Sequence, residues 1–137
     1  MSAQFDALFA AASAVRQHAY APYSRYQVGA AIRTEDGRVF AGCNVENAAY
    51  PQGQCAEASA IGVMVANGAT RIVEVVVIGG EEGDDMLCSP CGGCRQQLRE
   101  FAGPETPVHI CGPEGLRRTA TVAELLPLSF GPDNLGH

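Results

Sequence analysis

Two cysteines spaced three residues apart, in the segment Pro90-Cys91-Gly92-Gly93-Cys94, could bind a metal ion or form a redox pair. The segment opens a predicted helix, where residues i and i+3 lie about 60° apart around the axis, so both sulfurs can reach one ion. Unpaired amides and the helix dipole at this end favour the thiolate, which is the form that binds metal. By itself, C-x-x-C is compatible with a zinc site as well as with redox chemistry.

Cys88 repeats the spacing of three and introduces an iron–sulfur alternative, because Cys88-x-x-Cys91-x-x-Cys94 could begin a cluster-binding run. Such a run needs a fourth ligand near Pro-rich sequence, and Arg95 follows instead. The pattern therefore favours another metal over an iron–sulfur cluster.

A third thiol and a carboxylate occur together at Cys55-Ala56-Glu57, where another helix is predicted to begin. Positions i and i+2 point about 200° apart on a helix, so Cys55 and Glu57 are not natural co-ligands. If Cys55 caps the helix and binds metal, Glu57 can approach the open coordination position from the side. Three protein ligands plus one water form the catalytic zinc arrangement. A carboxylate beside such a water can accept and deliver its proton.

Hydrophobic periodicity predicts the elements that must position these residues. In chain order they are a helix over 3–18, a hairpin of strands 26–33 and 38–42, a loop over 44–54, a helix over 55–66, a strand over 72–78, a helix over 91–101, a strand over 107–111 and a short helix near 122–126. The hairpin implies an antiparallel part of the sheet, and the later crossover helix implies a parallel part. We expect an α/β fold, a three-layer α-β-α sandwich with a mixed sheet, formed by residues 1–137 as a single domain.

Composition narrows the function classes. The chain has 137 residues, of which 47% are hydrophobic and 18% charged, which excludes an intrinsically disordered protein. Its net charge of −6 argues against a nucleic-acid partner, and no apolar run approaches the roughly 20 residues that span a bilayer. An apolar stretch follows Asp6 without a cationic segment before it, which favours a cytoplasmic protein over a signal peptide.

The combination of Cys55-x-Glu57 with Pro90-Cys91-x-x-Cys94 matches the signature of zinc-dependent deaminases, with Cys55 in place of the usual His. Further segments extend the match from residue 20 to residue 132. These segments are Tyr20-Ala21-Pro22-Tyr23-Ser24, Tyr26-x-Val28-Gly29-Ala30-Ala31, Gly42-x-Asn44-Val45-Glu46-Asn47-Ala48-Ala49-Tyr50, and Leu125-Leu126-Pro127 with Phe130-Gly131-Pro132. The sequence therefore resembles the small homotetrameric cytidine deaminases.

The resemblance implies a hydrolase that converts cytidine and 2′-deoxycytidine to uridine and 2′-deoxyuridine in pyrimidine salvage, with release of ammonia. It assigns one Zn²⁺ per subunit to Cys55, Cys91 and Cys94. It assigns proton transfer between water and the base to Glu57.

The resemblance also implies a substrate site shared within a homotetramer. Asn44 and Glu46 match positions that bind ribose hydroxyls, which an amide and a carboxylate can do with directional hydrogen bonds. Phe130 matches an aromatic residue that a neighbouring subunit offers to the base. The remaining residues implied to contact substrate are Tyr26, Val45 and Ala56.

Two positions depart from the family pattern. Tyr26 stands where Phe is common and adds a hydroxyl beside the base pocket. Ala58 stands where some three-cysteine members carry an Arg that bonds to the zinc thiolates. Three thiolates and Zn²⁺ sum to −3 + 2 = −1, which makes a bound water less acidic. The two helix N-termini offset part of that charge, and Arg95 is the nearest candidate for the rest.

Three other functions remain open at this stage. A related aminohydrolase could act on another aminopyrimidine nucleoside such as blasticidin S. Deamination of RNA or DNA strands is disfavoured by the charge of −6 and the lack of a basic, aromatic stripe. A non-catalytic zinc site would need a fourth protein ligand and no adjacent carboxylate, so Glu57 argues against it. Cys43 and Cys111 fall at predicted strand ends, outside the metal motif.

Overall fold

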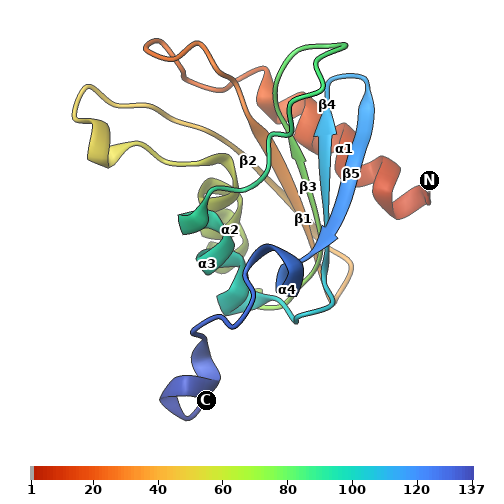
Figure 1. Ribbon diagram of the computed structural model, residues 1–137, viewed down its shortest axis with the longest axis vertical. Coiled ribbons are helices and arrows are strands. Elements are labelled where there is room, and N and C mark those ends of the chain that lie inside the picture. Colours follow the sequence, from red (N-terminus) through yellow and green to blue (C-terminus); the bar gives the residue numbers. More distant parts are fainter. Residues whose placement is uncertain (1) are drawn as a thin grey trace.

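The computed structural model describes residues 2–137 and places a five-stranded sheet between helices (Figure 1). The strands lie in the order β2-β1-β3-β4-β5. The elements are α1 (Ala3–Arg16), β1 (Gly29–Thr34), β2 (Val39–Cys43), α2 (Ala56–Ala66), β3 (Ile72–Ile78), α3 (Gly92–Phe101), β4 (Pro107–Gly112), β5 (Gly115–Thr121) and α4 (Val122–Leu125), with 3-10 helices at Tyr50–Gln52 and Pro132–Leu135. No helix within residues 2–137 is long and apolar enough to cross a membrane.

The sheet is mixed, as the sequence predicts. β1 pairs antiparallel with both β2 and β3, whereas β3 and β4 run parallel. Parallel neighbours require a crossover connection, and the segment containing α3 provides it. α2 connects β2 to β3 in the same way, because these two strands share a direction and β1 lies between them.

Helices cover both faces of the sheet. α1 packs on one face against β1, β2 and β3, and α2 packs on the opposite face beside α3 (Figure 1). Each face has its own apolar cluster: Val75 and Val77 belong to the one under α2 and α3, and Val76 and Ile78 to the one under α1. β3 is thus buried on both faces, which explains its nearly continuous apolar sequence. The predicted α-β-α sandwich is confirmed.

The sequence prediction missed β5, which pairs antiparallel with β4 at one edge of the sheet. Of its seven residues only Ala120 is buried, and Leu116 and Arg118 are exposed. A strand that buries so little of its surface has no clear hydrophobic alternation, so periodicity could not detect it.

The predicted strand over 26–33 begins later, at Gly29, because the side chain of Asn44 takes the backbone groups before it. Asn44 Oδ1 accepts a hydrogen bond from the N–H of Val28, and Asn44 Nδ2 donates to the carbonyl of Tyr26, each at 2.8 Å. The first helix ends at Arg16, two residues before the predicted end at His18.

Candidate active site

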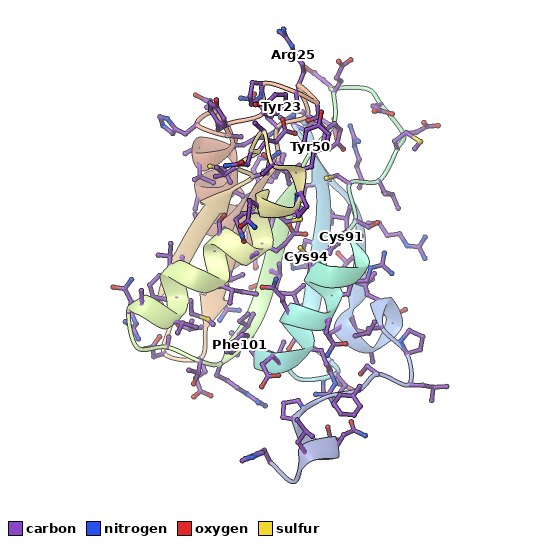
Figure 2. The ribbon with its side chains drawn as sticks, turned by 90° about the vertical axis from the view of Figure 1, so that its left-hand side faces the viewer. Tyr23, Arg25, Tyr50, Cys91, Cys94 and Phe101 are labelled. Atoms are coloured by element: carbon purple, nitrogen blue, oxygen red, sulfur yellow. The ribbon has the colours of Figure 1, made fainter. Side chains whose placement is uncertain are left out.

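Three cysteine sulfurs meet where α2 and α3 begin. Cys55 is the N-cap residue of α2, Cys91 is the N-cap residue of α3, and Cys94 lies in the first turn of α3. Their sulfur atoms all lie within 4.8 Å of one another, and the Sγ atoms of Cys55 and Cys91 are 3.9 Å apart. Figure 2 shows Cys91 and Cys94 together at this end of α3. The structure therefore brings together the three cysteines that the sequence singled out.

This cluster fits a zinc ion. Zinc–sulfur bonds of about 2.3 Å in tetrahedral geometry separate the sulfurs by about 3.8 Å, close to the spacing of Cys55 and Cys91. Among residues 2–137, no fourth His, Cys, Asp or Glu completes the group. Three protein ligands leave one position for water or substrate, as in catalytic sites, whereas structural zinc sites use four protein ligands.

The start of α3 prepares one thiol for metal binding. Backbone N–H groups of Cys94 and Gly93 face the sulfur of Cys91 and hold the pKa of that thiol below its usual value. Burial instead raises the pKa of Cys55 and of Cys94. A cation that compensates the charge favours the thiolate form of these two sulfurs, so metal binding and thiol deprotonation are linked.

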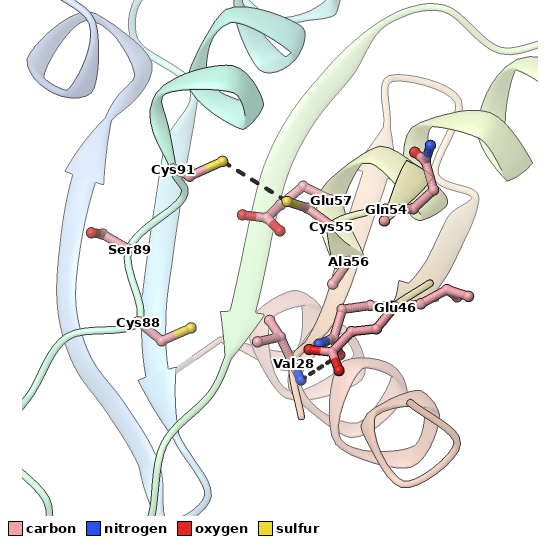
Figure 3. Close-up of a pocket in the computed structure, with 12 residues that line it drawn as sticks. Val28, Glu46, Gln54, Cys55, Ala56, Glu57, Cys88, Ser89 and Cys91 are labelled. Atoms are coloured by element: carbon pink, nitrogen blue, oxygen red, sulfur yellow. Dashed lines mark hydrogen bonds between the residues drawn. The ribbon is translucent and has the colours of Figure 1, made fainter. Parts of the chain in front are cut away.

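Glu57 lies beside the sulfur cluster without belonging to it. Its side chain is buried, at 4% exposure, and Figure 3 shows its carboxylate next to Cys55 in the pocket. Burial raises the pKa of this carboxyl above its ordinary value. A carboxyl group with a raised pKa is suited to accept and return a proton near neutral pH.

A pocket of about 310 Å³ opens in front of the sulfurs, within the range of small-molecule sites. The sequence-predicted residues that line it are Asn44, Val45, Glu46, Cys55, Ala56, Glu57 and Cys91. Five further lining residues were not predicted: Val28, Gly53, Gln54, Cys88 and Ser89. The sequence analysis considered Cys88 only as a metal ligand, because of its spacing from Cys91. No local sequence signal indicated that it lines the pocket.

Asn44 and Glu46 also hold the adjoining loop in place. The carboxylate of Glu46 accepts hydrogen bonds from the N–H of Tyr23 and from both the N–H and the hydroxyl of Ser24. These bonds, that of the Ser24 hydroxyl first, hold the pKa of Glu46 below its usual value. Glu46 is therefore ionised and fixed at the pocket rim, ready to accept further hydrogen bonds.

Two of the predicted substrate residues do not line the pocket within this chain. Tyr26 lies behind Cys88, where burial together with the neighbouring thiol raises its pKa to about 12. Phe130 is 58% exposed on the C-terminal segment, which extends beyond α3 (Figure 1). Their contact with substrate stays a prediction.

Arg95 makes hydrogen bonds to two backbone carbonyls, and its role in offsetting the thiolate charge stays a prediction. Its Nε donates to the carbonyl of Pro90 at 2.7 Å, and its Nη1 donates to the carbonyl of Leu125 at 2.9 Å. Arg95 thus fixes the backbone just before Cys91 and joins it to the end of α4.

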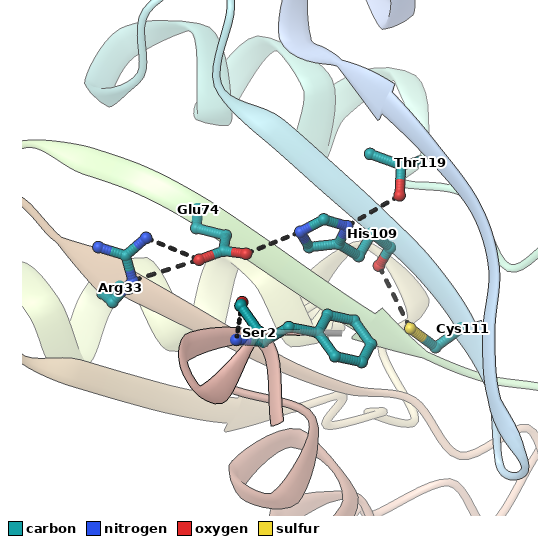
Figure 4. Close-up of polar contacts among 7 residues, drawn as sticks. Ser2, Arg33, Glu74, His109, Cys111 and Thr119 are labelled. Atoms are coloured by element: carbon teal, nitrogen blue, oxygen red, sulfur yellow. Dashed lines mark hydrogen bonds and ion pairs between the residues drawn. The ribbon is translucent and has the colours of Figure 1, made fainter. Parts of the chain in front are cut away.

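A second polar group, centred on the buried residues Glu74 and His109, lies on the other face of the sheet (Figure 4). Glu74 accepts from Arg33 at 2.7 Å and lies 2.8 Å from Nε2 of His109, whose Nδ1 is 2.9 Å from the Thr119 hydroxyl. Phe5 of α1 packs edge-on against the His109 ring. This network explains the single charge in β3 and is separate from the pocket.

Comparison with known proteins identifies relatives over most of the chain. Residues 3–110 match the family model described as the cytidine and deoxycytidylate deaminase zinc-binding region. A cytidine deaminase of Sporosarcina psychrophila is 39% identical over 132 residues, covering 96% of this chain and 95% of the relative. One of Mycobacterium tuberculosis is 41% identical, covering 85% of this chain and 82% of the relative.

Solved structures agree with this assignment. The crystal structure of cytidine deaminase from Burkholderia pseudomallei superposes with a TM-score of 0.84 at 41% identity, covering 95% of this chain and 100% of the other. That from Mycobacterium leprae gives a TM-score of 0.77 at 44% identity, covering 92% and 99%.

Proposed function

This chain belongs to the zinc-binding cytidine and deoxycytidylate deaminase family, and we propose that its pocket hydrolyses both cytidine and 2′-deoxycytidine, to uridine and 2′-deoxyuridine. The enzyme is a zinc-dependent hydrolase of cytidine; its use of the 2′-deoxy substrate is the finer part of the proposal. The observation that carries the function is the position of Glu57, a buried carboxylate beside three clustered thiols at one end of a nucleoside-sized pocket.

The proposed catalytic residues divide the work between metal binding and proton transfer. Cys55, Cys91 and Cys94 would hold one zinc ion, which supplies a Lewis acid that makes water a nucleophile at neutral pH. Glu57 accepts the proton that the attacking water loses and delivers it to N3 of the cytosine ring. The oxygen adds to C4, Glu57 passes on the second proton of that water, and the amino group leaves as ammonia. One carboxylate thus serves as both base and acid.

The opposite end of the pocket is proposed to hold the sugar. Glu46 and Asn44 line this end, and the carboxylate of Glu46 has acceptor capacity left for ribose hydroxyls. Val45 and Ala56 also line the pocket and are proposed to contact the nucleoside. Because Ala56 opens α2, its backbone N–H is one of the groups without a partner inside the helix and can bind a carbonyl oxygen of the base.

We also propose a homotetramer in which neighbouring subunits complete the site. Support comes from exposed aromatic residues around the pocket: Tyr50 is 76% exposed and contacts Tyr23 edge-on at the rim (Figure 2). Phe130, on the extended C-terminal segment, is the residue proposed to reach the base of a neighbouring site. Light scattering during gel filtration tests the assembly, and a monomer would contradict the shared site.

The proposal further includes a single domain over residues 1–137, a cytoplasmic location and a role in pyrimidine salvage.

The decisive experiment follows the ultraviolet absorbance of cytidine and of 2′-deoxycytidine with the purified, zinc-loaded protein. We expect both spectra to convert to those of the uridine products, with one ammonia released per substrate. Blasticidin S is tested as a substrate in a separate assay. Turnover of blasticidin S without turnover of cytidine would replace the proposed substrate by that antibiotic, and a folded, zinc-loaded protein inactive on all three would contradict the function.

A further inference from the structure

Cys88 is a free cysteine that lies outside the sulfur cluster and has a face on the pocket. It belongs to the connection between β3 and α3, is partly buried against the core, and lines the pocket with its neighbour Ser89 (Figure 3). Neither metal binding nor the proposed proton transfer uses it.

The side of Cys88 away from the pocket lies against Gly79. A Cβ atom added at Gly79 would collide with the sulfur of Cys88, would lie 2.8 Å from its Cβ, and would lie 3.2 Å from the hydroxyl oxygen of Tyr26. Gly79 is therefore required for this close approach, and the thiol has the backbone of Gly79 and the Tyr26 hydroxyl behind it. The backbone of Gly79 therefore limits how far the thiol can move away from a ligand in the pocket.

The two ends of the pocket fix how a pyrimidine nucleoside lies in it. C4 must face the sulfur cluster, where the reaction occurs, and N1 carries the sugar toward Asn44 and Glu46. The ring then has two free edges, one with N3 and the other with C5. Glu57, on α2, takes the N3 edge because it transfers the proton there.

The wall opposite the start of α2 faces the remaining edge. Figure 3 shows Cys88 and Ser89 on one side of the pocket and Ala56 on the other, with the Glu57 carboxylate extending from α2 into the space between them and the sulfur of Cys88 directed inward. With N3 toward α2, the C5 edge is directed toward Cys88.

We propose that Cys88 is a specificity-determining residue, whose sulfur limits the size of a substituent at C5 of the pyrimidine. This inference rests on the proposed function, since it needs a cytosine ring oriented by Glu57. Removing the sulfur should open space for a methyl group at C5, while a larger side chain should close it. Making or removing space for one methyl group in an apolar pocket changes the ratio of kcat/KM values for two substrates by about 10- to 200-fold.

The test compares cytidine with 5-methylcytidine in wild type, Cys88→Ala and Cys88→Ile. The measured quantity is kcat/KM for 5-methylcytidine divided by kcat/KM for cytidine. We expect this ratio to rise at least about tenfold in Cys88→Ala and to fall in Cys88→Ile. Cys111→Ala is the matched control, because it removes a buried thiol on the opposite face of the sheet and should leave the ratio unchanged.

Binding of the products provides an independent readout. The measured quantity is the Kd for 5-methyluridine divided by the Kd for uridine, determined by calorimetry. This ratio should fall in Cys88→Ala, which makes room for the methyl group, and rise in Cys88→Ile. Unchanged ratios in both variants, with cytidine still converted, would overturn the role of Cys88 alone. Absence of cytidine turnover in wild type would instead overturn the proposed function, and the binding ratios would still decide whether Cys88 reads the C5 edge.

Discussion

The Sγ atoms of Cys55 and Cys91 lie 3.9 Å apart although 36 residues separate the two cysteines in the chain. Each residue caps the N-terminus of a helix, and the two helices lie side by side on one face of the sheet (Figure 1). The sheet order determines this meeting, because α2 and α3 are both crossover helices on the same face of the sheet. Two helix N-termini, with their partial positive charge, thereby face one cluster of sulfurs.

Loss of one thiol should abolish stable zinc binding. Cys91 is exposed, so Cys91→Ser leaves no cavity, and its first effect is the loss of a metal ligand. We expect zinc retained after gel filtration to fall from about one ion per chain toward zero. When wild type and variant are both incubated with zinc, the variant should have the lower Tm. Cys111→Ala, which removes a thiol outside the cluster, should retain full zinc. Equal zinc content in both variants would contradict the assignment.

Replacing the carboxylate of Glu57 should stop turnover while the fold persists. Glu57→Gln keeps the size of this buried side chain, so zinc content and Tm should stay near those of wild type. Because positioned proton transfer contributes about 10²- to 10⁴-fold, we expect cytidine turnover to fall at least about a hundredfold. Glu82→Gln, at an exposed loop position, is the control. Turnover above roughly a hundredth of wild type would show that another group moves the proton.

We expect the main effect of Arg95 to be stabilisation of the structure around the site, and its effect on the charge of the site to be smaller. Its hydrogen bonds to the carbonyls of Pro90 and Leu125 are lost in Arg95→Ala. One hydrogen bond from a charged donor contributes about 1.5–3 kcal/mol, and because Arg95 is only partly buried, we expect the loss of both bonds to lower the free energy of unfolding in urea by at least about 1.5 kcal/mol. Arg118→Ala, at an exposed position of β5, should change the free energy of unfolding far less. Comparable losses in the two variants would argue against an anchoring role.

The buried network around Glu74 should make stability depend on pH in the acid range. Burial alone would raise the pKa of Glu74, but hydrogen bonds from Arg33 and His109 outweigh it and hold the pKa below the ordinary 4.5. The ionised carboxylate therefore adds stability above about pH 4.5, and that contribution is lost as pH falls through the lower folded-state pKa.

Glu74→Gln tests this dependence, because it removes the charge and keeps the shape. Breaking a fully buried ion pair costs about 3 kcal/mol or more, and because Arg33 is partly exposed, the variant should be less stable than wild type by about 1–3 kcal/mol at neutral pH. The difference should narrow as the pH of urea denaturation is lowered below 4.5. Glu35→Gln, in the exposed turn after β1, controls for the loss of one negative charge. A difference that is constant from neutral to acid pH would refute the linkage.

Replacement by Ala should change the free energy of unfolding in opposite directions at two glycines, Gly42 in β2 and Gly62 in α2. A Cβ at Gly42 would collide with the backbone nitrogen of Ala60 in α2 and lie 2.8 Å from the carbonyl carbon of Ser59. Gly42→Ala must therefore push α2 away from β2, and we expect a loss of about 1–3 kcal/mol. Gly62→Ala, inside α2 with no atom within 4 Å of the new Cβ, should gain up to about 1 kcal/mol. The urea midpoints of the two variants check both signs, and a stable Gly42→Ala would contradict the tight contact.

Local sequence patterns predicted most of the scaffold. The apolar run of β3 is nearly continuous because both faces are buried, and the helices predicted to begin at Cys55 and Cys91 begin one residue later. Such signals depend on hydrophobic periodicity, which acts within a few residues. β5 lacked them, because an edge strand that buries only Ala120 has no apolar alternation to detect.

The sequence by itself determined which residues could do the chemistry: three cysteines and Glu57, with spacings suited to a zinc site and a proton carrier. The tertiary structure alone decided what surrounds them. Val28 and Cys88 join the pocket wall, and Asn44 and Glu46 hold the neighbouring loop as well as the rim. No local pattern could show this, because the pocket is formed where segments distant in the chain meet across the sheet. Contacts between such segments depend on the order of the strands and on the close packing of the helices against them. The spacing of neighbouring residues predicts neither of these.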